Sequence, residues 1–450
     1  MRKLFGTDGI RAVAGESPLD WKTVYAVGLA LAHQIEKNGN AKRVVVLGMD
    51  TRESSGWIAG VLAKGLREGC VAVESAGVIT TPAIAYLARK HGFAAGVVIS
   101  ASHNPWEDNG IKIFGSDGYK LPDAVELGIE DEIFSRLERV STPDAEACAA
   151  PVVNDAYRAE YEAFLRGAVP GLTLDGLHVV LDCANGAASA IAPELFAGMG
   201  GKVTLTHVKP NGRNINANCG ALHPEIVAAE TKANGADLGV TFDGDADRCL
   251  FADANGKVVN GDAVLLLAGR DLKAQGKLAG DVVVATTMSN MGLEAALKLD
   301  GIRMLRAPVG DKYVLERMKA EGAALGGEQS GHILFPAMAT TGDGLLTALL
   351  VLDAVKRSGK RLDELVADLK VFPQVIVNVR VKEKKPLEKI ETVVVTITEA
   401  EQELADRGRV VVRYSGTEAL ARVMIEAESE ALMRKHAERI AGAIRDAIGV

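Results

Sequence analysis

The sequence predicts an α/β protein with several domains, and three features of its composition support that class. Apolar residues make up 48% of the chain, enough to bury several cores, while aromatic residues make up only 4%. The 48 glycines suit the many tight turns that join strands to helices in such proteins. A chain of 450 residues is too long for one core, and we expect about three or four domains at roughly 100–200 residues each.

A strand–turn–helix pattern occurs three times and predicts three α/β domains. Short apolar strands begin at Val44, Val179 and Val282. Each strand leads through a turn with a candidate cap residue into a segment with the 3.6-residue apolar period of a helix. The predicted helices cover residues 54–69, 187–200 and 292–299. Strands without polar residues belong to sheets that helices cover on both faces, which predicts three-layer domains.

After Pro373 the pattern changes and predicts a smaller α+β domain. Residues 375–381 alternate between apolar and polar, as a half-buried strand does. The segments that follow predict, in order, an amphipathic helix, two strands and a long final helix at 392–405, 410–413, 421–426 and 430–448.

Three stretches rich in turn-forming residues mark the expected joins between domains. They lie at 141–151, at 253–257 and from 357–360 onward. We therefore expect α/β domains at 1–150, 151–253 and 254–370, and the α+β domain at 371–450.

Charge and cysteine usage exclude several classes of protein. The net charge of −8 argues against a general nucleic-acid binder, which needs a basic surface to neutralise phosphates. The five cysteines are odd in number and lack CxxC spacing, so neither a disulfide framework nor a zinc site is indicated. No leader-like or membrane-length apolar stretch occurs in the sequence, and we expect a cytoplasmic protein without a nucleic-acid or membrane partner.

One stretch, residues 96–105, brings a serine to a loop at the edge of a predicted sheet. A β-branched run feeds directly into small and hydrogen-bonding residues, so Ser102 is the side chain that the strand delivers. A serine hydroxyl is a poor nucleophile unless a base, a metal or a previously attached group assists it. Polar residues that could assist it stand nearby in the sequence: His103, Asn104 and Lys112. A turn of Ser and Asn before proline is also common in loops without catalytic activity. Local sequence leaves a structural turn and a catalytic loop both open.

Three carboxylates follow another apolar strand at alternate positions: Asp243, Asp245 and Asp247. Their mutual repulsion would be costly unless they converge on a cation. Oxygen ligands alone favour Mg²⁺ or Ca²⁺ over Zn²⁺. An EF-hand would place a glutamate where Ala254 stands, so we interpret the triplet as a metal site and not as half an EF-hand or an acidic turn.

Three further polar stretches have the residue types of ligand-binding loops. Residues 2–11 combine two glycines, Thr7 and Arg11 in a turn that can face an anion, although a plain hairpin is the simpler interpretation. Residues 326–332 place Glu, Gln, Ser and His between three glycines, which suits hydroxyl recognition, with a surface loop as the alternative. Residues 413–418 combine an arginine, two hydroxyls and a glycine, the parts of a phosphate cradle.

In this order, the stretches resemble the α-D-phosphohexomutase superfamily across the whole chain. Residues 5–11 (FGTDGIR), 326–332 (GGEQSGH) and 340–344 (TTGDG) are most similar to its bacterial phosphoglucosamine mutase branch. The resemblance implies three mixed α/β three-layer domains and a C-terminal α+β domain, heart-shaped around a central cleft. It also implies an isomerase, an intramolecular phosphotransferase that converts glucosamine 6-phosphate reversibly to glucosamine 1-phosphate for peptidoglycan precursor synthesis.

The resemblance also implies roles for individual residues. Ser102 becomes the phosphoserine, and a 1,6-bisphosphate is the intermediate. The ligands of one Mg²⁺ are Ser102, Asp243, Asp245 and Asp247. The catalytic residues are Ser102, Lys112, His332 and Arg11, with the acid and base undecided. The substrate-binding residues are Thr7, Arg248, Glu328, Ser330, Arg413, Ser415, Gly416, Thr417 and Arg422. Glucosamine or glucose 1,6-bisphosphate is the expected activator, and a monomer or homodimer the expected assembly.

Other functions differ from this one in specific residues. A phosphomannomutase/phosphoglucomutase would share every residue above except those of the sugar-specificity loop at residues 326–332. A non-catalytic sugar-phosphate sensor would not need both Ser102 and a complete aspartate triplet, and a magnesium-dependent phosphatase would not need a second phosphate cradle. Glu328 near C2 of the sugar would favour an ammonium over a hydroxyl, and we expect Gln329 and the 340–344 turn to bear on the same choice.

Overall fold

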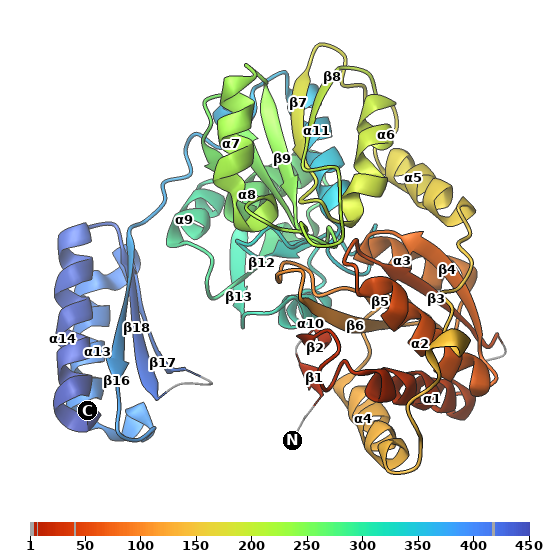
Figure 1. Ribbon diagram of the computed structural model, residues 1–450. Coiled ribbons are helices and arrows are strands. Elements are labelled where there is room, and N and C mark those ends of the chain that lie inside the picture. Colours follow the sequence, from red (N-terminus) through yellow and green to blue (C-terminus); the bar gives the residue numbers. More distant parts are fainter. Residues whose placement is uncertain (1–3, 7, 40–41, 416–418) are drawn as a thin grey trace. The chain divides into compact units, whose positions relative to one another are not determined.

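The computed structural model describes residues 4–6, 8–39, 42–415 and 419–450. These residues form two compact units, Met1–Met288 with Ile302–Ala367, and Ser289–Gly301 with Asp368–Val450. The first unit holds three sheets, and the second holds one (Figure 1). Among the described helices, none combines the length and the apolar character needed to cross a membrane.

The first sheet is mixed and delivers the serine loop. Its hydrogen-bonded order is β1 (Phe5–Gly6), β2 (Gly9–Val13), β6 (Asp108–Gly115), β5 (Ala95–Ile99), β3 (Val44–Met49) and β4 (Ala72–Val78). Strand β3 pairs in parallel with β4 and β5, whereas β6 runs antiparallel to β5 and β2. The helices of this part are α1 (Trp21–Lys37), α2 (Ser55–Glu68), α3 (Thr81–His91) and α4 (Asp123–Leu137).

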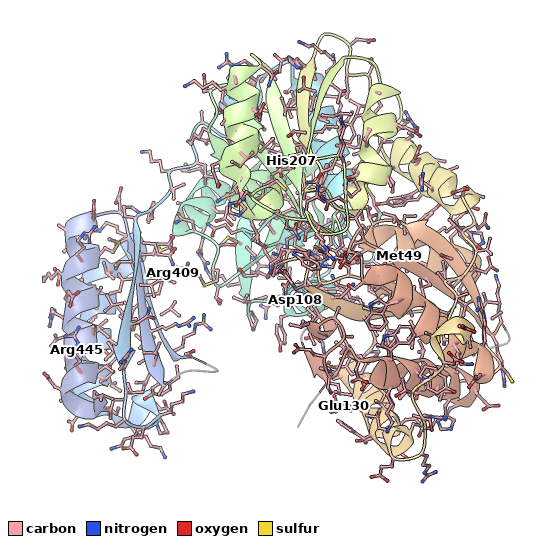
Figure 2. The ribbon with its side chains drawn as sticks, in the orientation of Figure 1. Met49, Asp108, Glu130, His207, Arg409 and Arg445 are labelled. Atoms are coloured by element: carbon pink, nitrogen blue, oxygen red, sulfur yellow. The ribbon has the colours of Figure 1, made fainter. Side chains whose placement is uncertain are left out.

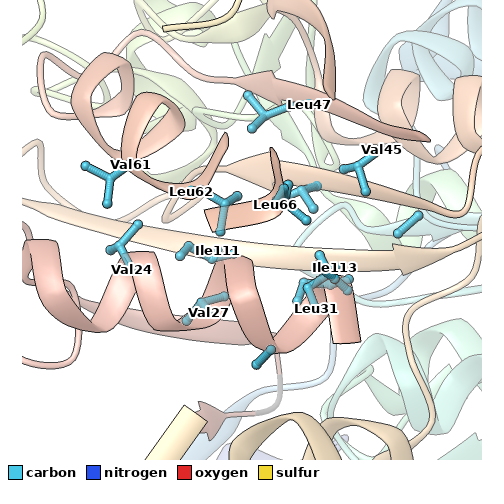
Figure 3. Packing of buried hydrophobic residues seen from close by; sticks show 14 of the residues in the cluster. Val24, Val27, Leu31, Val45, Leu47, Val61, Leu62, Leu66, Ile111 and Ile113 are labelled. Carbon is cyan, nitrogen blue, oxygen red and sulfur yellow. The ribbon is translucent and has the colours of Figure 1, made fainter. Parts of the chain in front are cut away.

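Helices cover both faces of this sheet, as the all-apolar strands predict. On one face the core joins strands β3 and β6 to helices α1 and α2, as Figure 3 shows for Val45, Leu47, Ile111, Ile113, Val24, Val27, Leu31, Val61, Leu62 and Leu66. On the other face α3 lies so close that a Cβ added at Gly48 or Gly96 would meet the Ile84 side chain. The N-terminal strand is tied to α4, because the Glu130 carboxylate accepts from the backbone N–H groups of Leu4 and Phe5 (Figure 2).

The second sheet has the order β11 (Val258–Val259), β10 (Cys249–Asp253), β9 (Leu238–Phe242), β7 (His178–Asp182) and β8 (Lys202–Thr206). Its helices are α5 (Ala156–Ala168), α6 (Ala192–Ala197) and α7 (Pro224–Ala233). The helix expected over 187–200 is interrupted: a 3₁₀ turn at Ala187–Ala190 precedes α6, because Ile191 is non-helical. The join expected at 253–257 is the turn of the β10–β11 hairpin, so the sheet runs past the expected boundary at 253.

The third sheet has the order β13 (Arg303–Ala307), β12 (Val282–Thr286), β14 (Leu325–Gly327) and β15 (Ile333–Leu334). Its first three strands are parallel, and β15 returns antiparallel to β14. Helix α8 (Gly261–Ala274) precedes these strands in the chain. The helices that come after one or more of them within the same unit are α10 (Asp311–Glu321), α11 (Gly344–Ser358) and α12 (Leu362–Leu365). The polar loop 326–332 is therefore the tight connection from β14 to β15.

The second unit contains the α+β part that the sequence predicts after Pro373. Its antiparallel sheet has the order β16 (Gln374–Arg380), β18 (Leu420–Ala427) and β17 (Gly408–Tyr414), with helices α9 (Met291–Leu299), α13 (Glu391–Leu404) and α14 (Glu430–Ile448). The buried Glu426 joins three segments of this unit. Its carboxylate pairs with Arg409 Nε at 2.5 Å and accepts from the Met291 N–H at 3.0 Å (Figure 2).

Close packing of α1 on α2 depends on two glycines. A Cβ at Gly65 would lie 2.5 Å from the Tyr25 carbonyl oxygen, and one at Gly28 would lie 2.5 Å from the Leu62 carbonyl oxygen. Such distances are far below van der Waals contact, so the two helices approach by backbone and not by side chain.

We expect Gly65→Ala to lower the free energy of unfolding by about 1–3 kcal/mol, because the added methyl group forces the helices apart. Gly56→Ala, in the first turn of the same helix with open space around it, is the matched control and should be neutral or stabilising by up to about 1 kcal/mol. Thermal unfolding of both variants beside the wild type checks this. Equal melting temperatures for the two variants would contradict the packing argument.

Candidate active site

The serine loop begins where β5 ends and holds Ser102 in an unusual backbone conformation. Ser102 is 1% exposed and has a φ of +53°, in the left-handed region that side chains other than glycine rarely adopt. Its N–H donates to Ser100 Oγ at 2.9 Å. Its carbonyl oxygen accepts from Arg52 Nη2 at 3.2 Å and from Asn216 Nδ2 at 2.9 Å. Groups from outside the loop therefore fix the conformation.

A buried aspartate organises these partners from the first domain. Asp50, 1% exposed, accepts from Ser100 Oγ at 2.6 Å and forms an ion pair with Arg52. The guanidinium of Arg52 also donates to the Asn104 carbonyl oxygen at 2.6 Å. Asp50 thus acts on the serine through both Ser100 and Arg52. The sequence predicts only that Asp50 lies in a turn, since its contacts with residues some fifty positions away leave no local signal.

The acidic loop comes from the second sheet and touches the serine loop. Asp243, Asp245 and Asp247 follow β9, are all buried, and offer carboxylate oxygens that lie within 4.8 Å of one another. Ser102 Oγ donates to Asp243 Oδ2 at 2.5 Å. A Cβ at Gly244 would collide with the Ser102 carbonyl oxygen, so only glycine allows this approach.

These three carboxylates suit a divalent cation. Asp245 Oδ1 and Asp247 Oδ1 are buried, and neither accepts a hydrogen bond within the described residues. Burial, together with the charges of Asp247 and Asp245, raises the pKa of Asp243 well above its usual value. Buried carboxylates gathered in this way need a positive charge among them, and a donor set made only of oxygens fits Mg²⁺.

Lys112 supplies part of that positive charge. Its ammonium, 2% exposed, lies 2.8 Å from Asp245 Oδ2, 2.9 Å from Asp8 Oδ2 and 3.4 Å from Asp247 Oδ2. Although burial opposes the charged form, these carboxylates raise the pKa of Lys112 well above its usual value. Lys112 therefore carries its proton.

His332, in the loop between β14 and β15, faces the same group of charges. Its Nδ1 lies 3.7 Å from Asp247 Oδ1 and its Nε2 lies 3.7 Å from Asp311 Oδ2. Its Nε2 also accepts from the Gly342 N–H at 3.2 Å, which leaves the ring proton on Nδ1, toward Asp247. Although burial opposes the charged form, the Asp247 and Asp311 carboxylates raise the pKa of His332 above its usual value.

The turn at residues 340–344 joins three parts of the first unit. Its Gly344 N–H donates to the Ala246 carbonyl oxygen of the acidic loop at 2.9 Å, and its Thr340 hydroxyl donates to the Gly118 carbonyl oxygen at 2.6 Å. With the Gly342 bond to His332, the turn supports the acidic loop and the imidazole at once. It does not line the cavity described next, and its expected bearing on the choice of sugar stays a prediction.

A cavity of about 510 Å³ opens beside the serine and acidic loops. Its lining residues are Leu4, Gly6, Asp8, Gly9, Arg11, His103, Lys120, Asp247, Arg248, Val309, Gly310, Asp311, Glu328 and His332. The sequence predicts Arg11, Arg248, Glu328 and His332 as functional residues, and the structure brings them together here. The sequence does not predict roles for Asp8, Lys120 or Asp311, because these roles depend on ion pairs between domains.

His103 is a further lining residue that the sequence prediction mentions but does not select. Its Nδ1 lies 3.2 Å from Ser102 Oγ. Burial, followed by the charges of Arg248 and Arg11, lowers the pKa of His103 to about 4. The imidazole next to the serine hydroxyl is therefore neutral.

The specificity loop divides its polar side chains between two directions. Glu328 lines the cavity, and its carboxylate accepts from the Gly310 N–H at 3.0 Å and from Ser330 Oγ at 3.4 Å. Gln329 Nε2 instead donates to Asp262 Oδ2 of α8 at 3.1 Å. Gln329 is therefore bound to α8 and does not line the cavity, and its bearing on the choice of sugar stays a prediction.

The predicted phosphate loop lies in the second unit, between β17 and β18. Arg413 and Arg422 are direct partners in the β17–β18 register, so their side chains leave the same face of the sheet. The Ser415 carbonyl oxygen accepts from Lys384 Nζ at 2.7 Å, which adds a cation that the sequence motif does not reveal. Gly416, Thr417 and, in the first unit, Thr7 lie outside the described residues.

Another group of possible metal ligands, Asp182, His207 and Cys219, lies near the ends of β7 and β8. The Asp182 carboxylate already accepts from the N–H groups of Ala184 and Gly220, both at 2.9 Å, and lies 3.2 Å from His207 Nδ1 (Figure 2). We interpret it as a hydrogen-bonded anchor for these loops.

Comparisons with known proteins agree along the whole chain. Models of the phosphoglucomutase/phosphomannomutase family match it in succession, as alpha/beta/alpha domain I at residues 2–140, domain II at 161–256, domain III at 260–372 and the C-terminal domain at 376–443. A curated relative from Koribacter versatilis (strain Ellin345), named phosphoglucosamine mutase, is 61% identical over 456 residues, which cover 100% of this chain and 98% of the relative.

Solved structures support the same fold. A phosphoglucomutase/phosphomannomutase family protein from Burkholderia thailandensis matches with a TM-score of 0.78 and 23% identity over 99% of each chain. Aspergillus fumigatus N-acetylphosphoglucosamine mutase, solved in complex with GlcNAc-6P and magnesium, matches with a TM-score of 0.64 and 20% identity, covering 100% of this chain and 96% of that one.

Asp343, in the turn that supports the site, gives a testable pH dependence of stability. Its carboxylate caps α11 by accepting from the Leu346 N–H at 3.0 Å and also accepts from the Tyr161 hydroxyl at 2.7 Å. Burial raises the pKa of Asp343 to about 6. As the pH rises, the Asp343 carboxyl group therefore ionises in the unfolded chain before it ionises in the folded protein. The free energy of unfolding falls between about pH 4 and pH 6 and stays lower above that range.

We expect Asp343→Asn, which keeps an acceptor for the Leu346 N–H, to gain stability relative to the wild type by about 2–3 kcal/mol as the pH rises from 4 to 8. Thermal unfolding of both proteins across this range measures the difference. Tyr161→Phe removes the hydrogen bond that the Tyr161 hydroxyl donates to the ionised Asp343 carboxylate. This variant should therefore lose stability at a higher pH than the wild type does. Parallel curves for the wild type and the Asn variant would contradict the assignment.

Proposed function

Because the chain belongs to the phosphoglucosamine mutase family of phosphohexomutases, isomerases that transfer a phosphoryl group within one substrate, we propose that the phosphoryl group passes through Ser102. The observation that carries the proposal is the contact of Ser102 Oγ with Asp243 Oδ2 at 2.5 Å, beside a cavity whose lining includes the side chains of Arg11, His103, Arg248 and His332. Phosphoryl transfer requires positioning and charge neutralisation above all, and these groups supply both.

The proposed reaction has two transfers and leaves the enzyme unchanged. First, the bond from phosphorus to Ser102 Oγ breaks as phosphorus bonds to O1 of glucosamine 6-phosphate, while O1 loses a proton and Oγ gains one. The product, glucosamine 1,6-bisphosphate, reverses its orientation. Then the bond from phosphorus to O6 breaks, phosphorus bonds to Oγ, Oγ loses its proton and O6 gains one. Glucosamine 1-phosphate leaves, and the phosphoserine is restored.

Asp243, Asp245 and Asp247 would hold a magnesium ion together with Ser102. Bound there, the ion would supply positive charge to offset the charge that develops on the transferred phosphoryl group. The buried oxygens of Asp245 and Asp247 that accept no hydrogen bond support this role. A 1,6-bisphosphate of glucosamine or glucose is the activator, since it can phosphorylate a serine that has lost its group.

Proton transfer involves the cations and imidazoles around the serine. Lys112 carries a proton and acts as an acid, while Arg11 and His332 neutralise charge on the transferring group. We add His103 as the group that exchanges a proton with Ser102 Oγ, because its Nδ1 lies 3.2 Å away.

Substrate binding is divided between sugar and phosphate contacts. Glu328 and Ser330 bind sugar hydroxyls and the C2 ammonium, and Arg248 binds near the transfer site. Thr7 also takes part in binding. The residues that bind the phosphate not being transferred are Arg413, Ser415, Gly416, Thr417 and Arg422.

The test of the substrate is kcat/KM for glucosamine, glucose and mannose 6-phosphates under one set of conditions with matching bisphosphate activators. We expect glucosamine 6-phosphate to be preferred by about tenfold to a few hundredfold, because one partly solvated carboxylate discriminates an ammonium from a hydroxyl by about 1–3 kcal/mol. A preference of the same size for glucose or mannose 6-phosphate would identify the chain as a phosphomannomutase/phosphoglucomutase and leave the role of Ser102 intact.

Ser102→Ala should lose at least about 10³-fold in kcat, because no other group can carry the phosphate between O1 and O6. Ser116→Ala, at an exposed serine in the turn after β6, is the matched control and should keep wild-type activity. Peptide mapping after treatment with the bisphosphate should find the phosphate on Ser102 in the wild type. Wild-type turnover by the Ser102 variant would overturn the mechanism.

A further inference from the structure

We propose that Lys120 is a positioning residue for phosphoryl transfer, which fixes the carboxylates of Asp8 and Asp311 in the wall of the cavity. The inference rests on the proposed function of this site. Lys120 Nζ lies 2.5 Å from Asp8 Oδ1 and 2.6 Å from Asp311 Oδ2. Asp8 follows β1 in the first domain and Asp311 begins α10 in the third, so one ammonium joins two domains across the cavity.

Each of these carboxylates also faces a candidate catalytic group. Asp8 Oδ2 lies 2.9 Å from Lys112 Nζ, and Asp8 forms an ion pair with Arg11. Asp311 Oδ2 lies 3.7 Å from His332 Nε2. The Asp247 carboxylate contacts both of these catalytic candidates: its Oδ2 lies 3.4 Å from Lys112 Nζ, and its Oδ1 lies 3.7 Å from His332 Nδ1. These groups therefore form a ring in which ammonium groups and carboxylates alternate from Lys112 through Asp8 and Lys120 to Asp311, and the His332 imidazole lies between Asp311 and Asp247.

Lys120 is the member of this ring best suited to hold the others in place. Its backbone is fixed by a bridge to Phe114 and by the turn in which the Gly115 N–H donates to the Tyr119 carbonyl oxygen at 2.8 Å. Side-chain exposure is only 21% for Lys120, 21% for Asp8 and 19% for Asp311, so solvent screens the ion pairs incompletely. The two carboxylates raise the pKa of Lys120, and it stays charged.

A direct contact of Lys120 with substrate phosphate is the competing role, because Lys120 also lines the cavity. The local charge argues against it. The ammonium of Lys120 already pairs with two carboxylates at 2.5 and 2.6 Å, so little of its charge is left to attract phosphate. Arg11 and Arg248, which line the same cavity, are better placed to attract it.

Without the ammonium, Asp8 and Asp311 would repel each other and turn away, and Lys112 and His332 would lose part of the field that orients them. Substrate binding by the arginines and Glu328 would continue. The effect should therefore fall on the rate of the bound complex more than on the binding of substrate.

The test compares Lys120→Met and Lys120→Arg in the full-length protein with glucosamine 6-phosphate. We expect the Met variant to lose about 10–100-fold in kcat with a change in KM below about threefold, and the Arg variant to recover most of kcat, since a guanidinium can bridge two carboxylates. Lys312→Met is the matched control. It removes an ion pair with Asp123 from the adjacent position in α10, outside the cavity lining, and should keep wild-type kinetics.

A double-mutant cycle with Asp311→Asn tests whether Lys120 acts through its partner. We expect the combined variant to lose no more than the worse of the two single variants. Additive losses, or a rise in KM above about tenfold with kcat preserved, would overturn the proposal and assign Lys120 to phosphate binding. Wild-type kinetics of Lys120→Met would also overturn it.

Two readouts separate this inference from the proposed function. If wild-type protein and Lys312→Met fail to convert any hexose phosphate, the proposed function has failed. A crystal structure of Lys120→Met then still decides the inference without substrate: Asp8 and Asp311 turned apart would support it, and unchanged carboxylates would overturn it. Thermal unfolding of Lys120→Arg and Asp311→Asn guards against a variant that does not fold.

Discussion

The structure of the site depends on the repulsion among three buried carboxylates. Asp243, Asp245 and Asp247 come from one short loop, and none of them can escape into solvent. Lys112 and the backbone N–H of Arg248, which donates to Asp243 Oδ1 at 3.2 Å, offset part of that charge, and the loop suits a divalent cation that would offset the rest. The loop is further fixed by Thr81, whose hydroxyl donates to Asp245 Oδ2 at 2.5 Å.

Much of this could be predicted from the sequence, because local chemistry carries it. All-apolar strands predict covered sheets, and the final helix at Glu430–Ile448 has the predicted bounds. The acidic triplet is recognisable because carboxylates at alternate positions after a buried strand repel one another unless a cation lies among them. The family assignment, which the comparisons confirm, depends on motifs spread along the whole chain.

The rest could not be predicted, because it consists of contacts between distant residues or of backbone details. Lys120 and Asp311 are 191 positions apart, and no local sequence motif indicates that they form an ion pair. The sequence does not show that Gln329 turns toward Asp262 while its neighbour Glu328 faces the cavity. The break at Ile191 and the hairpin at 253–257 depend on backbone dihedrals and strand pairing that the apolar pattern does not encode.

The contacts of the Ser102 carbonyl oxygen have a consequence for the order of assembly. Arg52 of the first domain binds this oxygen, but so does Asn216, and Gly244 and Asp243 close over the same loop. These last three residues belong to the chain segment that is synthesised later. The first domain therefore emerges from the ribosome with its serine, Ser100 and Arg52, but without Asn216, Asp243 and Gly244. The full set of contacts around Ser102 therefore forms only when the second domain has folded against the first.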